Sequence, residues 1–204
     1  MMTPSLTGID IGSPLPSGST TISSSRVDIT AGGADIWETR DEFHFANTEV
    51  TGDFEVSVRV ESLAMADAYT KAGLMLRTSL AAGSPHAMLL VFGDNQARNH
   101  NNGGLEFQSR LTLDQSCSGI YPPQPLPTEP DFPVNYPNVW LKLVRRGDKI
   151  TGLSSSDGQE WKTFSVLEHA FPEKGFIGLA VTSHNPDQTV DAVFSQLIVS
   201  SPKD

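Results

Sequence analysis

An alternation of apolar and polar residues constrains the fold of this chain more than any other feature. In residues 53–62 (DFEVSVRVES), every second residue from Phe54 to Val60 is apolar, and the residues between them are charged or polar. Successive side chains of a β-strand point to opposite faces, so this pattern gives one apolar face and one polar face. An α-helix would repeat its apolar residues every three or four positions, so the segment is predicted to be a strand.

The same period of two recurs along most of the chain. Ser156-Asp157-Gly158 joins two such runs, 149–153 and 160–166, and an Asp-Gly pair between strands is a strong hairpin signal because glycine adopts the positive φ that the turn needs. Further runs occupy residues 42–45, 72–77, 86–92, 105–110, 139–145, 175–182 and 190–199. Since no segment has a long 3.6-residue stripe, the chain is predicted to be all-β, a two-sheet antiparallel β-sandwich of roughly ten to thirteen strands.

The length of 204 residues suits one domain over 1–204, because single sandwiches often reach roughly 200–250 residues. Residues 1–25, rich in Ser, Thr, Gly and Pro, are expected to form an N-terminal arm or an edge strand. Seven of the 14 prolines fall between Pro122 and Pro137. Proline gives no backbone N–H to a strand ladder, so 114–138 is predicted to be a Pro-rich loop. Such a loop either forms a lid or wall over a pocket or is only packed against the sandwich.

Charge and composition exclude several classes of function. Lys and Arg number 14 against 24 Asp and Glu, a formal charge of −10, which opposes a nucleic-acid or anionic-membrane surface. Cys117 is the only cysteine, so neither an internal disulfide nor a Cys-rich zinc site can form. No apolar run approaches the roughly 20 residues of a membrane span. Because no basic and apolar leader is visible, a cytoplasmic protein, or one whose leader has been removed, is expected.

Trp37 and the DEFHF run at 41–45 have the chemistry of a ligand site. Strand alternation places the two phenylalanines of the run on the core side and Glu42 and His44 on the other side. An indole stacks on the apolar face of a sugar, while a carboxylate and an imidazole bond its hydroxyls. A solvated surface strand beside a core tryptophan is the alternative. His184, at the end of a strand, is a further candidate, or else it only hydrogen-bonds a turn.

Residues 71–92 are predicted to form a hairpin around an AAGSP turn. Pairing Arg77 with His86 places Lys71 on the same face and turns the intervening apolar residues toward the core. The polar residues of the 105–110 run alternate in the same way. The predicted polar patch consists of Glu42, His44, Lys71, Arg77, His86, Gln108 and Arg110.

Motifs for metal, nucleophilic or phosphate chemistry are absent from the sequence. There is no His-x-His pair, no His-Glu-x-x-His, no Gly-x-Ser-x-Gly and no Gly-rich phosphate loop. Asp10, Asp53 and Asp187 are candidate Ca²⁺ ligands, because sandwiches can hold calcium with carboxylates; no other cofactor is predicted. If the protein cleaves a glycoside, Glu42 is the candidate acid or base, and Glu106 is the carboxylate that would accompany it.

The amino-acid sequence of several segments resembles that of a known family, and the resemblance extends over most of the chain, from about Gly8 to Val199. The matching segments are 34–37 (ADIW), 41–45 (DEFHF), 71–77 (KAGLMLR), 84–87 (SPHA) and 178–184 (GLAVTSH). The family is the uncharacterised group of β-sandwich proteins that includes the yeast regulation-of-enolase protein, within the concanavalin A-like lectin/glucanase superfamily. This resemblance implies a jelly roll whose concave face binds or cuts glycans. The superfamily's Glu-x-Asp-x-x-Glu glucanase motif is missing, since Glu129-Pro-Asp131 is followed by Val134 where the last Glu should be.

Three functions stay open. The first is non-catalytic binding of a carbohydrate or small polyol, with stacking on Trp37 and with basic side chains that favour an acidic sugar. The second is a glycan-active enzyme that uses Glu42 as acid or base. The third, implied by the resemblance, is an intracellular protein-interaction or regulatory role with a glycolytic enzyme as the candidate partner.

Overall fold

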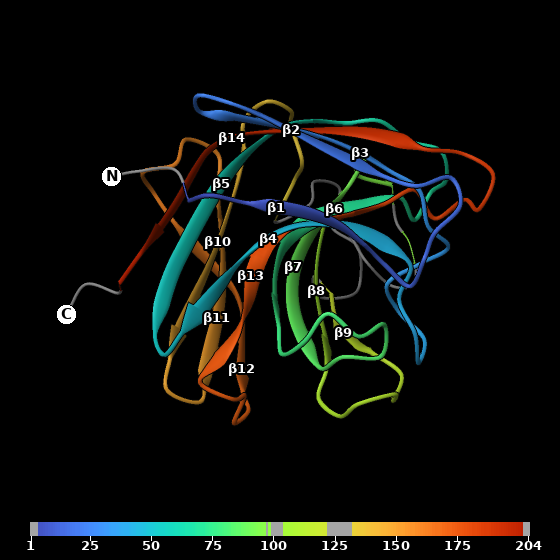
Figure 1. Ribbon diagram of the computed structural model, residues 1–204. Coiled ribbons are helices and arrows are strands. Elements are labelled where there is room, and N and C mark those ends of the chain that lie inside the picture. Colours follow the sequence, from blue (N-terminus) through green and yellow to red (C-terminus); the bar gives the residue numbers. More distant parts are fainter. Residues whose placement is uncertain (1–3, 97, 99–103, 122–131, 202–204) are drawn as a thin grey trace.

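Two seven-stranded antiparallel sheets pack face to face in the computed structural model of the chain, shown in Figure 1. The structure describes residues 4–96, 98, 104–121 and 132–201. Within these residues there are fourteen strands and no helix, which confirms the predicted all-β sandwich. The described residues accordingly include no helix that is long and apolar enough to cross a membrane.

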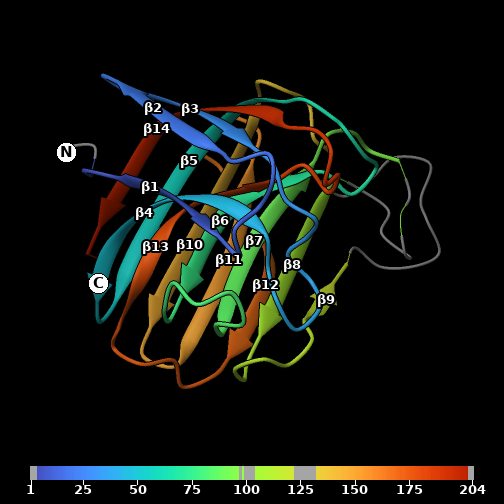
Figure 2. The same cartoon turned by 45° about the vertical axis from the view of Figure 1, so that its right-hand side comes forward.

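The two sheets are named sheet A and sheet B, and their strands follow in spatial order. Sheet A contains β1 (Thr7–Ile11), β4 (Phe43–Thr51), β13 (Lys174–Thr182), β6 (Lys71–Arg77), β7 (His86–Phe92), β8 (Leu105–Arg110) and β9 (Ser118–Ile120). Sheet B contains β12 (Lys162–Glu168), β11 (Lys149–Ser155), β10 (Val139–Arg146), β5 (Phe54–Leu63), β14 (Val190–Ser200), β3 (Arg26–Ala31) and β2 (Ser19–Ser23). Neighbours such as β4 and β13 are far apart in sequence, so the chain crosses repeatedly between the two sheets (Figure 2).

The residues that alternate along β5 fill the space between the sheets. Phe54, Val56, Val58 and Val60 are at most 1% exposed and belong to the main core cluster. Burial of apolar surface on this scale is the dominant favourable term in folding. The pattern from which the strand was predicted is therefore also the pattern that builds the core.

The β6–β7 hairpin has the predicted register. Arg77 lies opposite His86, and Lys71 lies opposite Phe92. The apolar residues between them, such as Leu74, face sheet B and join the main core. The polar residues lie on the other surface of sheet A, which is called the outer face below. β8 extends this arrangement by pairing with β7.

The faces of β4 differ from the prediction. The phenylalanines Phe43 and Phe45 do not enter the core between the sheets but a second apolar cluster on the outer face of sheet A. His44 points the other way, because it pairs with Val181 of the main core. Alternation tells which residues share a face, but both faces of sheet A carry an apolar layer. The aromatic pair could therefore be buried on either side.

The N-terminal region supplies an edge strand to each sheet. β1 pairs with β4 at the edge of sheet A, and β2 pairs with β3 at the edge of sheet B. The predicted 114–138 loop contains the short strand β9, which pairs with β8. Residues 122–131 of that loop lie outside the described residues, and Phe132 after them is buried in the main core.

Residues 32–41, called the 32–41 loop, lie across the outer face of sheet A and are held there by a buried carboxylate. Asp41 accepts one hydrogen bond from Arg77 at 2.6 Å and two from Arg110 at 2.7 Å each. All three side chains are fully buried. Burial opposes ionisation, but the hydrogen bonds from Arg110 and the arginine charges hold the pKa of Asp41 below its ordinary value.

Further hydrogen bonds attach the same loop to β8 and β13. Arg110 donates to the carbonyl of Glu38 at 2.5 Å, and Gln108 donates to the carbonyl of Ile36 at 2.7 Å. Thr182 donates to the carbonyl of Gly33 at 3.0 Å. A Cβ at Gly33 would lie 2.0 Å from a backbone oxygen and its φ is +115°, so this close approach requires glycine. Figure 2 shows this segment (blue) passing β8 and β9.

Replacing Asp41 by Asn tests the role of this carboxylate. The change keeps the shape but leaves two buried guanidinium groups without their counter-charge, and we expect a loss of about 3–5 kcal/mol in the free energy of unfolding. Urea denaturation measures this loss. The exposed Asp28, paired with Arg26, is the control, and Asp28→Asn should change stability little. Equal stability of the two variants would contradict the assigned role.

Candidate ligand-binding site

The nine predicted ligand residues separate into three groups in the structure. Arg77, His86, Gln108 and Arg110 lie in the buried cluster around Asp41. Glu42 and His44 point away from that cluster. Only Trp37, Lys71 and His184 line one open pocket together.

The buried cluster has no surface to offer a ligand, because Arg77, His86 and Arg110 are fully buried. Burial lowers the pKa of His86 to about 3, so its imidazole is neutral. Burial also raises the pKa of the Cys117 thiol to about 12. Asp41, His86 and Cys117 are close enough together to suggest a metal site. Both oxygens of Asp41 are, however, hydrogen-bonded to guanidinium groups, whose charge repels a cation. The cluster therefore serves to fasten the 32–41 loop.

Glu42 and His44 also differ from the predicted patch. His44 is 3% exposed, and its two ring nitrogens lie 2.7 Å from Asp10 and 2.7 Å from Thr20. It therefore joins β1 and β4 to β2 of the other sheet. Glu42 is not among the residues that line the open pocket, and its carboxylate lies 3.4 Å from the backbone nitrogen of Ala34.

Two of the three candidate calcium ligands, Asp10 and Asp53, lie far apart. Asp10 pairs with His44 at the start of β4, whereas Asp53 follows the far end of that strand and accepts a hydrogen bond from Gly147. Nine residues of extended chain separate the two positions, or about 30 Å. Asp10 is engaged by His44 and by the backbone of Gly18. These two carboxylates therefore lie too far apart to hold one Ca²⁺ ion together.

The open pocket lies on the outer face of sheet A and has a volume of about 170 Å³. The 32–41 loop provides two of its residues, and β6 and β8 provide one each. The others follow β9, follow β13 or precede β6. The lining residues are Asp35, Trp37, Tyr69, Lys71, Glu106, Tyr121 and His184.

Asp35 pairs with both cations of this pocket. Its oxygens lie 2.8 Å from Lys71 Nζ and 3.3 Å from His184 Nε2. Burial opposes ionisation of Asp35, but the His184 hydrogen bond and the Lys71 charge outweigh it and lower its pKa to about 2. His184 also contacts Asp67 at 3.0 Å through Nδ1, and the bond with Asp35 raises the pKa of His184. His184 has a φ of 54°, an uncommon conformation that often marks functional sites.

Glu106 differs from the other charged groups of the pocket because one of its carboxyl oxygens lacks a hydrogen-bond partner within the described residues. Its residue is 4% exposed, and Oε1 has no hydrogen-bond partner within the described part of the chain. Burial raises the pKa of Glu106 to about 7, against the opposing charge of Lys71 and together with the like charge of Asp35. A buried polar atom without a partner is rare in native proteins and requires an explanation.

Three aromatic side chains complete the pocket. The ring of Trp37 lies 5.9 Å from Lys71 Nζ, and the ring of Tyr69 lies 5.3 Å from that of His184. The backbone of Gly119 approaches Trp37 and Tyr121 so closely that a Cβ there would lie 2.7 Å from the Tyr121 hydroxyl and 3.2 Å from the indole. Apolar rings beside convergent polar groups are the usual composition of a small-molecule site.

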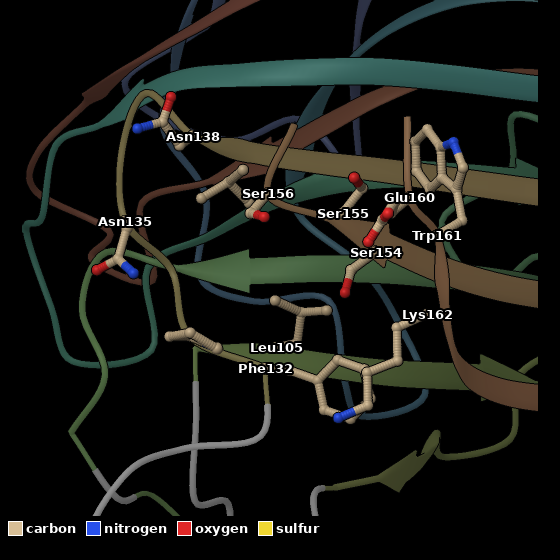
Figure 3. Close-up of a pocket in the computed structure, with 12 residues that line it drawn as sticks. Leu105, Phe132, Asn135, Asn138, Ser154, Ser155, Ser156, Glu160, Trp161 and Lys162 are labelled. Atoms are coloured by element: carbon tan, nitrogen blue, oxygen red, sulfur yellow. The ribbon is translucent and has the colours of Figure 1, made fainter. Parts of the chain in front are cut away.

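A larger hollow of about 670 Å³ lies on another part of the surface. Figure 3 shows Asn135 and Asn138 on one side of it and Ser154 and Trp161 on the other. Lys162 lies over the ring of Phe132 at 4.4 Å. Its charged residues, including Lys162, are exposed. The described residues that line it therefore include no buried charged group, and we assign the candidate site to the smaller pocket.

The sequence analysis named three of the seven lining residues as ligand contacts and Glu106 only as a candidate catalytic carboxylate, and it missed Asp35, Tyr69 and Tyr121. Glu106 has the same parity along β8 as Gln108 and Arg110, so alternation alone places it on the same face. Asp35 lies within the ADIW segment that contains Trp37. Tyr69 and Tyr121 lie outside strands, where no periodic signal points to them.

Comparison with solved structures defines the class of fold. A functionally unknown protein from Saccharomyces cerevisiae superposes with a TM-score of 0.70 at 18% identity, covering 98% of both chains. The carbohydrate-binding module CBM66 from Bacillus subtilis has a TM-score of 0.60 at 14% identity, covering 98% of this chain and 97% of that one. The GH43 protein BlXynB from Bacillus licheniformis has a TM-score of 0.60 at 9% identity, and 90% of this chain covers 38% of it.

These matches show that the chain shares the β-sandwich fold of these structures. No family model and no curated protein sequence matches the chain.

The raised pKa of Glu106 predicts a pH dependence of stability. From its ordinary value of 4.5 up to about 7, the folded protein keeps a proton on Glu106 that the unfolded chain releases. The folded state then binds more protons, so stability falls as the pH rises through this window. We expect the stability of wild type relative to Glu106→Gln to fall by about 3 kcal/mol between pH 4 and 8. Urea denaturation of both proteins measures this, and a constant difference would contradict it.

Proposed function

We propose that the chain is a carbohydrate-binding β-sandwich and that the pocket around Trp37 and Glu106 holds one sugar or polyol unit. The observation that carries the proposal is the buried Glu106 carboxyl, whose Oε1 accepts no hydrogen bond within the described residues, in a pocket with three aromatic side chains. Its volume of about 170 Å³ is below the roughly 300–1,000 Å³ of pockets for drug-sized ligands, which favours a single ring.

The charges of the pocket favour binding over catalysis. A general base needs a pKa near the working pH and a free lone pair. Asp35 has a pKa of about 2, and both nitrogens of His184 contact carboxylates. Neither Asp35 nor His184 is therefore free to act as the acid–base partner of Glu106. Glu42, the catalytic candidate from sequence, does not line the pocket.

The fold and the sequence motifs support the same proposal. One of the similar structures is described as a carbohydrate-binding module, and it covers nearly the whole chain. We further propose that the chain belongs to the family that includes the yeast regulation-of-enolase protein, on the strength of the quoted motifs and of the fold shared with a yeast protein. The cytoplasmic location and the glycolytic partner stay predictions.

A glycan screen with two tryptophan variants tests the proposal. Trp37→Ala removes the stacking surface of the pocket. We therefore expect it to bind the glycans found in the screen at least about tenfold more weakly than wild type does, a loss of about 1.4 kcal/mol in binding free energy. Trp161→Ala, in the larger hollow, is the matched control and should bind like wild type. Isothermal titration calorimetry measures both.

Three outcomes count against the proposal. If the wild-type protein binds no glycan in the screen, the proposed function is wrong. If Trp37→Ala binds glycans as tightly as wild type does, the pocket around Trp37 is not the binding site. Loss of binding in Trp161→Ala alone moves the site to the larger hollow. Circular dichroism on each variant verifies that the sandwich is intact.

A further inference from the structure

We propose that Glu106 determines specificity and that the pocket selects an uncharged, hydroxyl-bearing sugar or polyol over both uronic acids and amino sugars. The inference rests on the proposed function and names the chemical class of the ligand. It follows from the donors and acceptors that the pocket leaves unused.

The pocket offers one spare acceptor close to spare donors. Glu106 Oε1 has no partner within the described residues. Lys71 Nζ has three N–H groups and is paired with Asp35 at 2.8 Å, which leaves donors for a ligand. Both residues line the pocket, and the charge of Lys71 acts on the Glu106 carboxyl. A hydroxyl both donates and accepts, so one hydroxyl satisfies Glu106 and Lys71 together.

A carboxylate suits this pocket poorly. A ligand carboxylate can only accept hydrogen bonds, so when Glu106 is ionised it leaves Glu106 Oε1 without a donor and adds a negative charge beside Glu106 and Asp35. Both cations are already paired, Lys71 with Asp35 and His184 with Asp35 and Asp67. The expectation of an acidic sugar depended on a wider basic patch that included Arg77 and Arg110, and these two arginines are buried against Asp41.

An ammonium group also suits the pocket less well than a hydroxyl. It can donate to Glu106, but it offers no acceptor to the N–H groups of Lys71. Its positive charge would also lie close to that of Lys71, which is 4% exposed and therefore little screened by solvent. The pocket thus disfavours both charged forms of a sugar, each for a different reason.

The test uses methyl glycosides of glucose, galactose and mannose together with their uronic-acid and amino-sugar counterparts. Wild-type protein is expected to bind at least one neutral glycoside at least about tenfold more tightly than its amino-sugar counterpart at pH 7. The same preference over its uronic-acid counterpart is expected at pH 8, where Glu106, with a pKa of about 7, is mostly ionised. Glu106→Gln keeps the size of the side chain but adds N–H donors that a carboxylate can use. This variant should therefore narrow the preference for the neutral sugar over the uronic acid at least threefold.

A matched control separates specificity from a general change of charge. Glu49→Gln, at an exposed position of β4 in the same sheet, removes the same charge outside the pocket and should leave the preference unchanged. Glu106→Gln removes a buried ionisable group, so it is not expected to unfold the protein.

The outcomes distinguish this inference from the proposed function. Binding that depends on Trp37 but is equally tight for the uronic acid or the amino sugar overturns the inference and leaves carbohydrate binding standing. An unchanged preference in Glu106→Gln also overturns it. If no glycoside binds, or if binding is independent of Trp37, the proposed function itself fails. A neutral preference that Glu106→Gln narrows and Glu49→Gln does not supports the inference.

Discussion

The structure of the candidate site depends on one buried interaction, the carboxylate of Asp41 between two guanidinium groups. Burying charges is costly, and a buried ion pair stabilises a fold only when its geometry is good and its hydrogen bonds are satisfied. Here Arg110 makes a two-pronged contact with Asp41 and Arg77 adds a third bond. The result is a fixed path for the 32–41 loop across sheet A. Asp35 and Trp37 lie on that loop, so the pocket exists because Asp41 is buried.

The sequence predicts the parts of this fold that depend on alternation. It yields the strands, the sandwich and the register that sets Arg77 opposite His86, because a shift of one residue would turn the apolar side chains of the hairpin toward the wrong face. It fails at β4, where Phe43 and His44 have exchanged their expected faces. The alternation of apolar and polar residues does not reveal a second apolar layer. That layer is covered by loop residues, which have no periodic pattern in the sequence.

The site is predictable only in part, for a related reason. Trp37, Lys71 and His184 could be chosen as ligand contacts by residue type and by parity, and they do line one pocket. Arg77 and Arg110 share that parity but are buried. Whether a polar residue on a sheet face meets a ligand or a loop depends on a partner that is distant in sequence. Here the partner is Asp41, and the sequence gives no sign of its role beyond its position before Glu42.

Hydrogen bonding of the buried polar atoms distinguishes the two parts of the outer face, which are the closed cluster around Asp41 and the open pocket. Within the described residues four buried side-chain atoms lack a hydrogen-bond partner: Arg77 Nε, Glu106 Oε1, Gln108 Oε1 and Ser165 Oγ. Those of Arg77 and Gln108 lie in the closed cluster around Asp41, where a ligand has no access. Glu106 alone among the four lines the open pocket, so its missing partner can be supplied from solution. A cost of about 1–3 kcal/mol for an unsatisfied group is recovered when a ligand hydroxyl reaches it, and this makes Glu106 the residue from which recognition is best measured.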